Sequence, residues 1–176
     1  MNAEQVILSR GLPKTGEIIT TPEGCDGFYQ AGWWVGQKEA PYKTRFIAKT
    51  IGGDDVVIDL ATGLMWAADG NEAGCKNGAA KVWDYALWWP IITAFAGFSD
   101  WRVPNVKELM SIVDNGRQNP AIKQLPFSNT VSLGYWTSTT FLPSTDEGWI
   151  VHFAEGVVTH KDKDTSYYLR CVRGGL

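Results

Sequence analysis

The side chains that could carry out acid–base, nucleophilic or metal chemistry are few, and their spacing matches no catalytic motif. The histidines are His152 and His160, and the cysteines are Cys25, Cys75 and Cys171. The sequence has no HExxH, GxSxG, P-loop or GxGxxG pattern, and no CxxC or Cys/His spacing typical of zinc sites. A dyad of Cys171 with a histidine is the one nucleophile–base pair left open. We therefore expect no catalytic residues, no bound metal and no cofactor.

Two groups of carboxylates have the chemistry of an acid/base pair or a calcium site. Asp162 and Asp164 stand in the sequence KDKD, and Asp54 and Asp55 follow two glycines. Neither group has the 12-residue pattern of a calcium loop, and Asp beside Gly is typical of turns. We interpret all four as solvated turn residues.

Side chains suited to binding gather near the C-terminal end of the sequence. Between residues 135 and 168, Tyr, Trp, Phe and His alternate with Ser and Thr. Rigid aromatic rings beside short hydroxyl side chains are the mixture that binding surfaces use. Alternation along the strand places Trp149, Val151 and Phe153 toward the core, and Ile150, His152 and Ala154 outward. A ligand-binding surface is therefore predicted here.

The predicted surface combines the 137–146 loop, the outward positions of the 149–160 hairpin and the 164–168 segment. Its residues are Thr139, Thr140, Phe141, Ser144, Asp146, His152, His160, Asp162, Asp164, Tyr167 and Tyr168. Phe141 stands in the polar stretch TTFLPSTDEG, and a loop tip rarely reaches the core, so its ring is expected to be exposed. Tyr135 and Trp136 are expected in the core instead.

Composition bounds the kind of protein that must carry this surface. The 176 residues are 44% hydrophobic and 20% charged, as in one globular domain. Nine Trp and 19 Gly predict a loop-rich domain held by aromatic packing. A net charge of -3 argues against nucleic-acid binding, and no apolar run reaches the ~18 residues of a membrane span. We expect neither a nucleic-acid partner nor membrane insertion.

Periodicity predicts two helices and an antiparallel sheet, an α+β fold. One helix is predicted within residues 81–98, with an apolar stripe that includes Trp83, Ala86 and Ile91 and with Pro90 kinking or dividing it. The second begins after Asn105, where Glu108 completes a capping box.

The strands are predicted from alternation and turn residues. The stretch from Ile47 to Leu60 reads as a hairpin around IGGDD. After Phe127, three or four short strands separated by Gly and Asp turns predict an antiparallel meander that includes the final SYYLRCVRGG. Both helices are expected to pack against this sheet.

Several motifs coincide in order and spacing with those of one family. They are DLATGLMW, FSDWRVPNVKEL, NPAI, YWTST, GWIVHF and LRCVRGG. They resemble the Lcl C-terminal domain family, and LPKTG, CDGFYQAG and the Arg45-Phe46 pair extend the resemblance to residues 11–175. It implies a single C-type-lectin-like α+β domain, two helices packed on an antiparallel sheet. We expect this domain over 11–176, after an N-terminal extension of residues 1–10.

The sequence departs from the family at one cysteine. Members often carry a cysteine near the DWR motif that can pair with the cysteine of the closing strand, but ITAFAGFSDW has none. Cys171 is therefore expected as a small buried thiol. One disulfide with one free thiol, and three buried thiols, both fit the three cysteines. The Glu-Pro-Asn and Gln-Pro-Asp loops of calcium-dependent lectins are also absent, and Val103-Pro104-Asn105 reads as a helix cap.

The resemblance implies a recognition module that binds a protein or a glycan on a cell surface, as a homo-oligomer or within a larger assembly. The fold class also resembles the variable proteins of diversity-generating retroelements, which favours display on a phage or other virion or on a bacterial or archaeal cell surface. The first residues, MNAEQVILSR, lack the pattern of a secretory signal. The alternative is an oxidase like formylglycine-generating enzymes, whose chemistry needs two close copper-binding cysteines.

Overall fold

The structure, a computed structural model, describes residues 15–29 and 45–174. The second of these stretches begins with a β-hairpin. The strands β1 (Phe46–Ile51) and β2 (Asp54–Asp59) pair in antiparallel register, as predicted. Gly52 and Gly53 form the turn with φ of 63° and 96°, which glycine adopts without strain. The expected extension, residues 1–10, lies outside the described residues.

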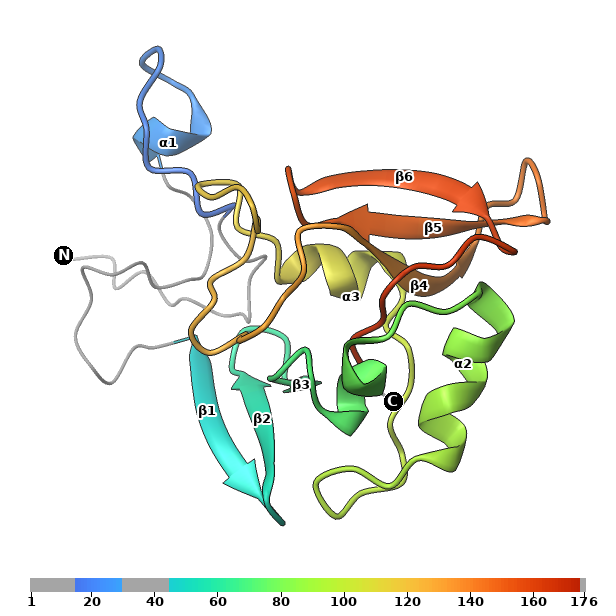
Figure 1. The fold of residues 1–176 in the computed structure, drawn as a ribbon. Coiled ribbons are helices and arrows are strands. Elements are labelled where there is room, and N and C mark those ends of the chain that lie inside the picture. Colours follow the sequence, from blue (N-terminus) through green and yellow to red (C-terminus); the bar gives the residue numbers. More distant parts are fainter. Residues whose placement is uncertain (1–14, 30–44, 175–176) are drawn as a thin grey trace, which may run out of the picture.

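The hairpin belongs to a four-stranded sheet with the order β1-β2-β3-β7. β3 (Met65–Ala67) pairs with β7 (Val172–Arg173), which is the closing strand of the chain. The prediction that the final segment extends the C-terminal meander is wrong, and Figure 1 shows this red segment running past β4 toward β3. Val172 and its partner Trp66 are both fully buried. The closing strand is thus held beside β3 by burial of apolar side chains, which the local sequence does not reveal.

The predicted meander exists as a second, three-stranded sheet. It consists of β4 (Gly134–Thr140), β5 (Glu147–His152) and β6 (Val157–Asp162), paired in that order. Both of its faces are covered, because Val151 lies in one hydrophobic cluster and Ile150 in another. Alternation correctly placed Val151 inward, but the outward placement of Ile150 is wrong.

The helix α3 (Val106–Ser111) forms as its capping signals predict. The Asn105 side chain accepts a hydrogen bond from Glu108 N at 2.9 Å, and the Glu108 carboxylate accepts one from Asn105 N at 2.8 Å. The Arg102 guanidinium donates two hydrogen bonds of 2.7 Å to the same carboxylate. The cap therefore fixes where this helix begins relative to the buried Trp101.

The helix α2 (Trp83–Ile92) is shorter than predicted, and Pro90 lies in its last turn without dividing it. The predicted apolar stripe is also wrong in part, because Ile91 is 73% exposed while Ala86 and Pro90 are buried. This helix is apolar on every side, so hydrophobicity alone does not identify its buried face. Two further short helices are α1 (Asp26–Tyr29) and the 3-10 helix η2 (Ala73–Gly78).

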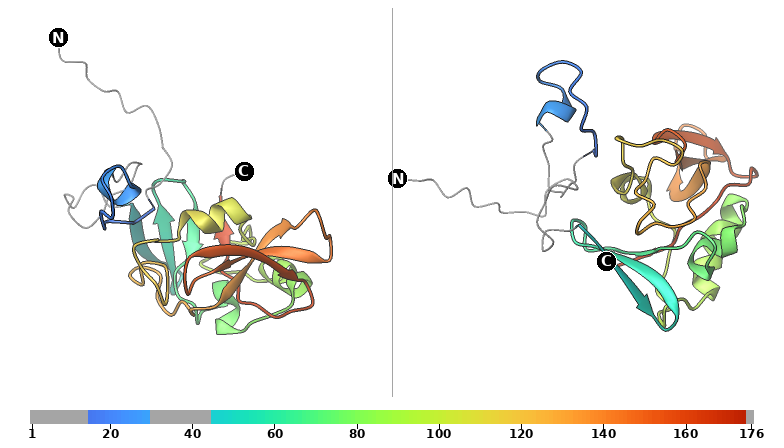
Figure 2. Two further views of the ribbon diagram at one scale, coloured as in Figure 1. Left: turned by 90° about the horizontal axis from the view of Figure 1, so that it is seen from above. Right: turned by 60° about the vertical axis from the view of Figure 1, so that its left-hand side comes forward.

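The two main helices cover opposite faces of the β4–β5–β6 sheet. α3 contributes Leu109 to the cluster that contains Val151, and α2 contributes Ala86 to the cluster that contains Ile150. Figure 2 shows the β1–β2 hairpin standing apart from this second sheet. The architecture is therefore α+β with two antiparallel sheets, which confirms the predicted fold class. Among the described residues, none of the helices combines the length and apolarity needed to span a membrane.

Charged side chains join the buried elements. Arg45 and Asp59 form a buried ion pair with bonds of 2.8 and 2.6 Å. The fully buried Arg170 donates to the carbonyl oxygens of Ala67 and Ala68. It also donates to the Thr130 hydroxyl at 2.7 Å. Arg170 thus ties the closing segment to the region just after β3.

Candidate functional site

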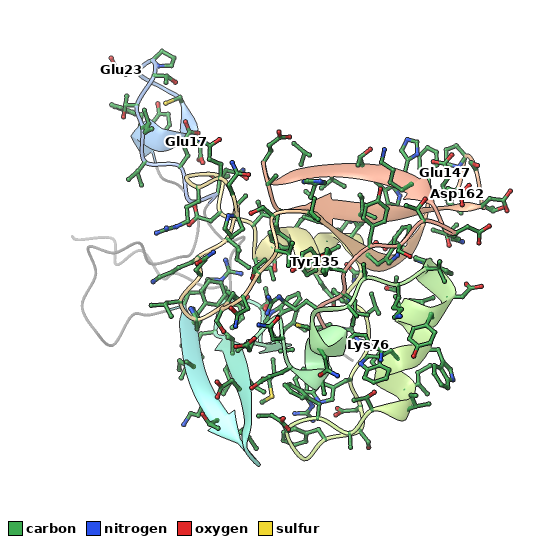
Figure 3. All side chains as sticks on the ribbon, in the orientation of Figure 1. Glu17, Glu23, Lys76, Tyr135, Glu147 and Asp162 are labelled. Atoms are coloured by element: carbon green, nitrogen blue, oxygen red, sulfur yellow. The ribbon has the colours of Figure 1, made fainter. Side chains whose placement is uncertain are left out.

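Most of the predicted binding residues meet at one end of the β4–β5–β6 sheet. The loop 141–146 joins β4 to β5 there, and β6 ends beside it. The residues brought together are Thr139, Thr140, Phe141, Ser144, Asp146, His160, Asp162 and Asp164. Figure 3 shows Glu147 and Asp162 side by side at this end, far from Tyr135 in the interior. We call this end of the sheet, residues 139–149 and 160–165, the loop face.

Three rings pack together at the base of the loop. Phe141 stacks on His160 with a centroid distance of 3.8 Å and an interplanar angle of 4°. Trp149, which lies opposite His160 across the strands, meets Phe141 edge-on at 5.2 Å. Phe141 is therefore half-buried, and the prediction that its ring is exposed is wrong. The stacking partner of Phe141 is His160 of β6, and the sequence around Phe141 gives no sign of this contact.

Glu147 closes the loop and contacts the stacked histidine. Its carboxylate touches His160 Nδ1, and its carbonyl oxygen accepts a hydrogen bond from Phe141 N at 2.9 Å. Across the strands it lies opposite Asp162. Sequence reasoning missed Glu147, although its position two residues before Trp149 puts both side chains on one face of β5.

Lys163 holds the loop from the other side. Its ammonium group donates to Thr145 O at 2.7 Å and to Thr140 Oγ1 at 3.1 Å. The same group lies 4.0 Å from the ring centre of Trp83 at the start of α2. Asp162 and Asp164, which flank Lys163 in KDKD, are exposed as predicted, and sequence reasoning missed the half-buried Lys163 between them.

The tip of the loop presents an apolar side chain to solvent. Leu142 is 82% exposed, and hydrogen bonds of 3.0 Å from Ser144 N to Phe141 O and from Glu147 N to Ser144 O shape the turn behind it. The loop face also carries exposed carboxylates at Asp146, Asp162 and Asp164 and an exposed lysine at Lys161. It therefore offers an exposed aliphatic side chain on a surface with more acidic than basic side chains. Sequence reasoning missed Leu142.

His152 does not join the loop face. It pairs with Gly134 and Val157 at the opposite end of the sheet. Its Nδ1 accepts a hydrogen bond from Ala154 N at 3.3 Å. Alternation correctly placed the His152 side chain on the opposite face of the strand from the buried Val151 and Phe153. It does not tell at which end of a sheet a residue lies.

Tyr167 and Tyr168 are half-buried packing residues beside β4. Tyr167 meets Trp136 edge-on at 5.1 Å and exchanges backbone hydrogen bonds with Lys81. Tyr168 lies against Tyr135, with ring centres 5.5 Å apart. Tyr135 and Trp136 are buried as predicted. The two tyrosines stand on opposite sides of the sheet, so they do not form one surface with Phe141.

The cysteines differ in their surroundings. Cys75 and Cys171 are buried in one cluster, and burial raises the pKa of both thiols. The burial of Cys171 is as predicted, but the alternative of three buried thiols is wrong because Cys25 is only half-buried. A backbone hydrogen bond from Thr21 lowers the pKa of the half-exposed Cys25. In the described ranges, we find no group of three or more His, Cys, Asp or Glu side chains arranged to hold a metal ion.

Comparison with known proteins identifies one family. The family described as Lcl C-terminal domain matches residues 55–173, more than half of the chain. This match includes both sheets except β1, and the whole of the loop face. A search of curated proteins gives no match.

Proposed function

The chain belongs to the Lcl C-terminal domain family, and from this premise we propose that it is a non-catalytic recognition module that binds its ligand at the loop face. The proposal includes a C-type-lectin-like fold for the domain, as the resemblance implies. It also includes exposure on a cell or virion surface, where a homo-oligomer or a larger assembly would multiply weak single-site binding.

The observation that carries the proposal is the loop 141–146, an exposed tip on a firmly held base. Leu142 is open to solvent, while the base is fixed by the Phe141–His160 stack and by the two hydrogen bonds from Lys163. A loop already held in one conformation loses little entropy on binding. Such a loop is suited to recognition.

The chemistry of the loop face favours a protein ligand over a glycan. The exposed tip is aliphatic, and the ring of Phe141 already packs against His160 and Trp149. Stacking on sugars would need a free aromatic face. The loop face carries the exposed carboxylates Asp146, Asp162 and Asp164 against the one exposed lysine of these residues, Lys161, and this excess of negative charge complements a partner with basic residues beside an apolar pocket. We propose a cell-surface protein with this chemistry as the ligand.

An array of glycans and a panel of cell-surface proteins, probed with the purified chain, tests this function. For a protein that binds, Leu142→Asp is expected to weaken affinity about tenfold or more, as hot-spot changes do. Asp162→Asn should weaken it less and make it less sensitive to salt. Glu155→Gln, a matched change at an exposed residue at the opposite end of β5, should leave affinity unchanged. Binding that survives Leu142→Asp but is lost in Glu155→Gln would reject the loop face.

The relationship to variable proteins of diversity-generating retroelements is a further part of the proposal. Its support is that the exposed residues of the loop face lie in a C-terminal segment of the chain. Sequencing of the surrounding genome tests it. A nearby imperfect copy of the segment for residues 137–168 together with a reverse-transcriptase gene is expected, and the lack of both contradicts it.

The enzymatic alternative rests on Cys75 and Cys171, which share one hydrophobic cluster. Burial raises the pKa of both thiols, so each is protonated at neutral pH. A nucleophile or metal ligand needs the thiolate, and this favours the recognition module. Copper-dependent oxidation of a cysteine-containing peptide, abolished by Cys171→Ser, would reverse this preference.

A further inference from the structure

Two cysteines that are distant in the sequence are joined through the backbone in the core. Cys75 belongs to η2, and Cys171 lies directly before β7. Cys171 N donates a hydrogen bond of 2.9 Å to the carbonyl oxygen of Gly74, the residue before Cys75. The two side chains are 2% and 1% exposed and belong to the same hydrophobic cluster.

Covalent geometry turns this hydrogen bond into a limit on the distance between the two Cα atoms. The Cα of Cys171 is one bond from the donor nitrogen, and the Cα of Cys75 is one peptide unit from the accepting oxygen. With standard bond lengths, the two Cα atoms lie no more than about 7 Å apart. Disulfides span Cα distances up to roughly this value.

We propose that Cys75 and Cys171 form a disulfide under oxidising conditions, crosslinking η2 to the closing segment of the chain. This pairing would not use a cysteine near the DWR motif, since residues 92–101 contain none. All three cysteines are free thiols in the structure, so the proposal concerns the oxidised form of the chain. Cys25 lies in a separate segment, against Ile19 O, and is expected to remain a thiol on oxidation.

The step balances with oxidised glutathione as the oxidant. The thiolate of one cysteine attacks the glutathione disulfide and releases one glutathione. The second cysteine then attacks the mixed disulfide and releases the other glutathione. The two protein sulfurs lose two electrons in total, and the two glutathione sulfurs gain them. The two protons leave the protein thiols and end on the glutathione thiols.

Burial determines when this reaction occurs. It raises the pKa of both cysteines, the carboxylates of Asp69 and Glu72 raise that of Cys75 further, and Arg170 acts in the opposite direction on both. The folded chain therefore holds little thiolate and gives glutathione no access to it. The disulfide is expected to form during folding and, once formed, to resist reduction in the folded state.

Refolding of the Cys25→Ser variant tests the pairing. The variant is unfolded in denaturant, then refolded with oxidised or with reduced glutathione, and its remaining thiols are alkylated. With oxidised glutathione, no alkylated cysteine and one peptide link between Cys75 and Cys171 are expected in the mass spectrum. The melting temperature should exceed that of the reduced form, and the Cys25→Ser/Cys171→Ala variant should show no such rise.

The wild-type chain gives a second readout that does not depend on a variant. Refolded with oxidised glutathione, it should show the same 75–171 link, whereas the chain folded under reducing conditions should acquire it far more slowly in the same mixture. Two alkylated cysteines after refolding of Cys25→Ser, separate glutathione adducts on Cys75 and Cys171, or a link from Cys25 to either one would overturn the proposal.

Discussion

At the scale of single residues, Lys163 shows how one half-buried side chain can fix the shape of the loop face. Its ammonium group lies over the ring of Trp83 and donates to Thr145 O and Thr140 Oγ1 in the loop region. A carbonyl at the loop tip accepts one of these hydrogen bonds, so the shape of the loop depends on a residue beyond the end of β6.

Replacing Lys163 with Met is expected to loosen the loop while leaving the fold intact. Methionine keeps a side chain of similar length beside Trp83, but it lacks the charge that lies over that ring and cannot donate to Thr145 O or Thr140 Oγ1. We expect a loss of about 1 kcal/mol of unfolding free energy and faster amide hydrogen exchange in residues 141–147. Lys161→Met, at an exposed lysine near the end of β6, is the control. Equal exchange rates in both variants would contradict this role.

Which of these residues could be predicted depends on how local their contacts are. Thr140, Ser144 and Asp146 were found because composition points to the segment that contains them. Glu147 and Lys163 were missed because their roles come from neighbouring strands, and no pattern within either strand reveals such contacts. The pairing of strands also separates His152 from His160, which the sequence does not indicate.

At the scale of elements, α3 and α2 show opposite cases. The start of α3 could be predicted because its capping box is a local signal, with Asn105 and Glu108 three residues apart. The buried face of α2 could not, because a helix that is apolar all round gives no preferred direction. The closing strand β7 was misplaced for a third reason, since its choice of β3 depends on burial against Trp66.

The cap of α3 makes a pH-dependent contribution to stability. Burial would raise the pKa of Glu108, but hydrogen bonds from Arg102 and the Asn105 backbone outweigh it, so the pKa lies below its usual value of 4.5. A carboxyl with a lowered pKa in the folded state stabilises above pH 4.5, and this contribution is lost as the pH falls through the folded value.

The Glu108→Gln variant tests this dependence. Glutamine preserves the cap bond but not the charge, so the unfolding free energy at pH 7 should fall by about 1 kcal/mol. The gap between variant and wild type should shrink in melting curves recorded from pH 7 down to pH 3. Glu155→Gln provides the exposed control. A gap that stays constant over this range would contradict the contribution of the charge.

At the scale of the whole molecule, the residues of the buried core and those of the proposed binding surface are separate sets. Trp66 is fully buried in the hydrophobic cluster that also contains Leu109 and Val151. Leu142, at the loop face of the β4–β5–β6 sheet, is exposed to solvent. Trp66→Ala is expected to lower the unfolding free energy by roughly 3–5 kcal/mol, as buried aromatic truncations do. Leu142→Ala should change it by less than about 0.5 kcal/mol.

Urea denaturation of the two variants beside the wild type measures this contrast. Trp101→Ala, another buried indole, should behave like Trp66→Ala. If Leu142→Ala proved as destabilising as either of them, the loop would contribute to the core, and the separation of the two sets would be wrong.

The loop 141–146 keeps its shape chiefly through the main chain, because the bonds Phe141 N–Glu147 O, Ser144 N–Phe141 O and Lys163 Nζ–Thr145 O need only peptide atoms from the loop. The side chains of residues 142, 143 and 145 can therefore change while the backbone conformation of the loop stays the same. A lineage could exchange the tip by single codon changes without passing through an unfolded ancestor.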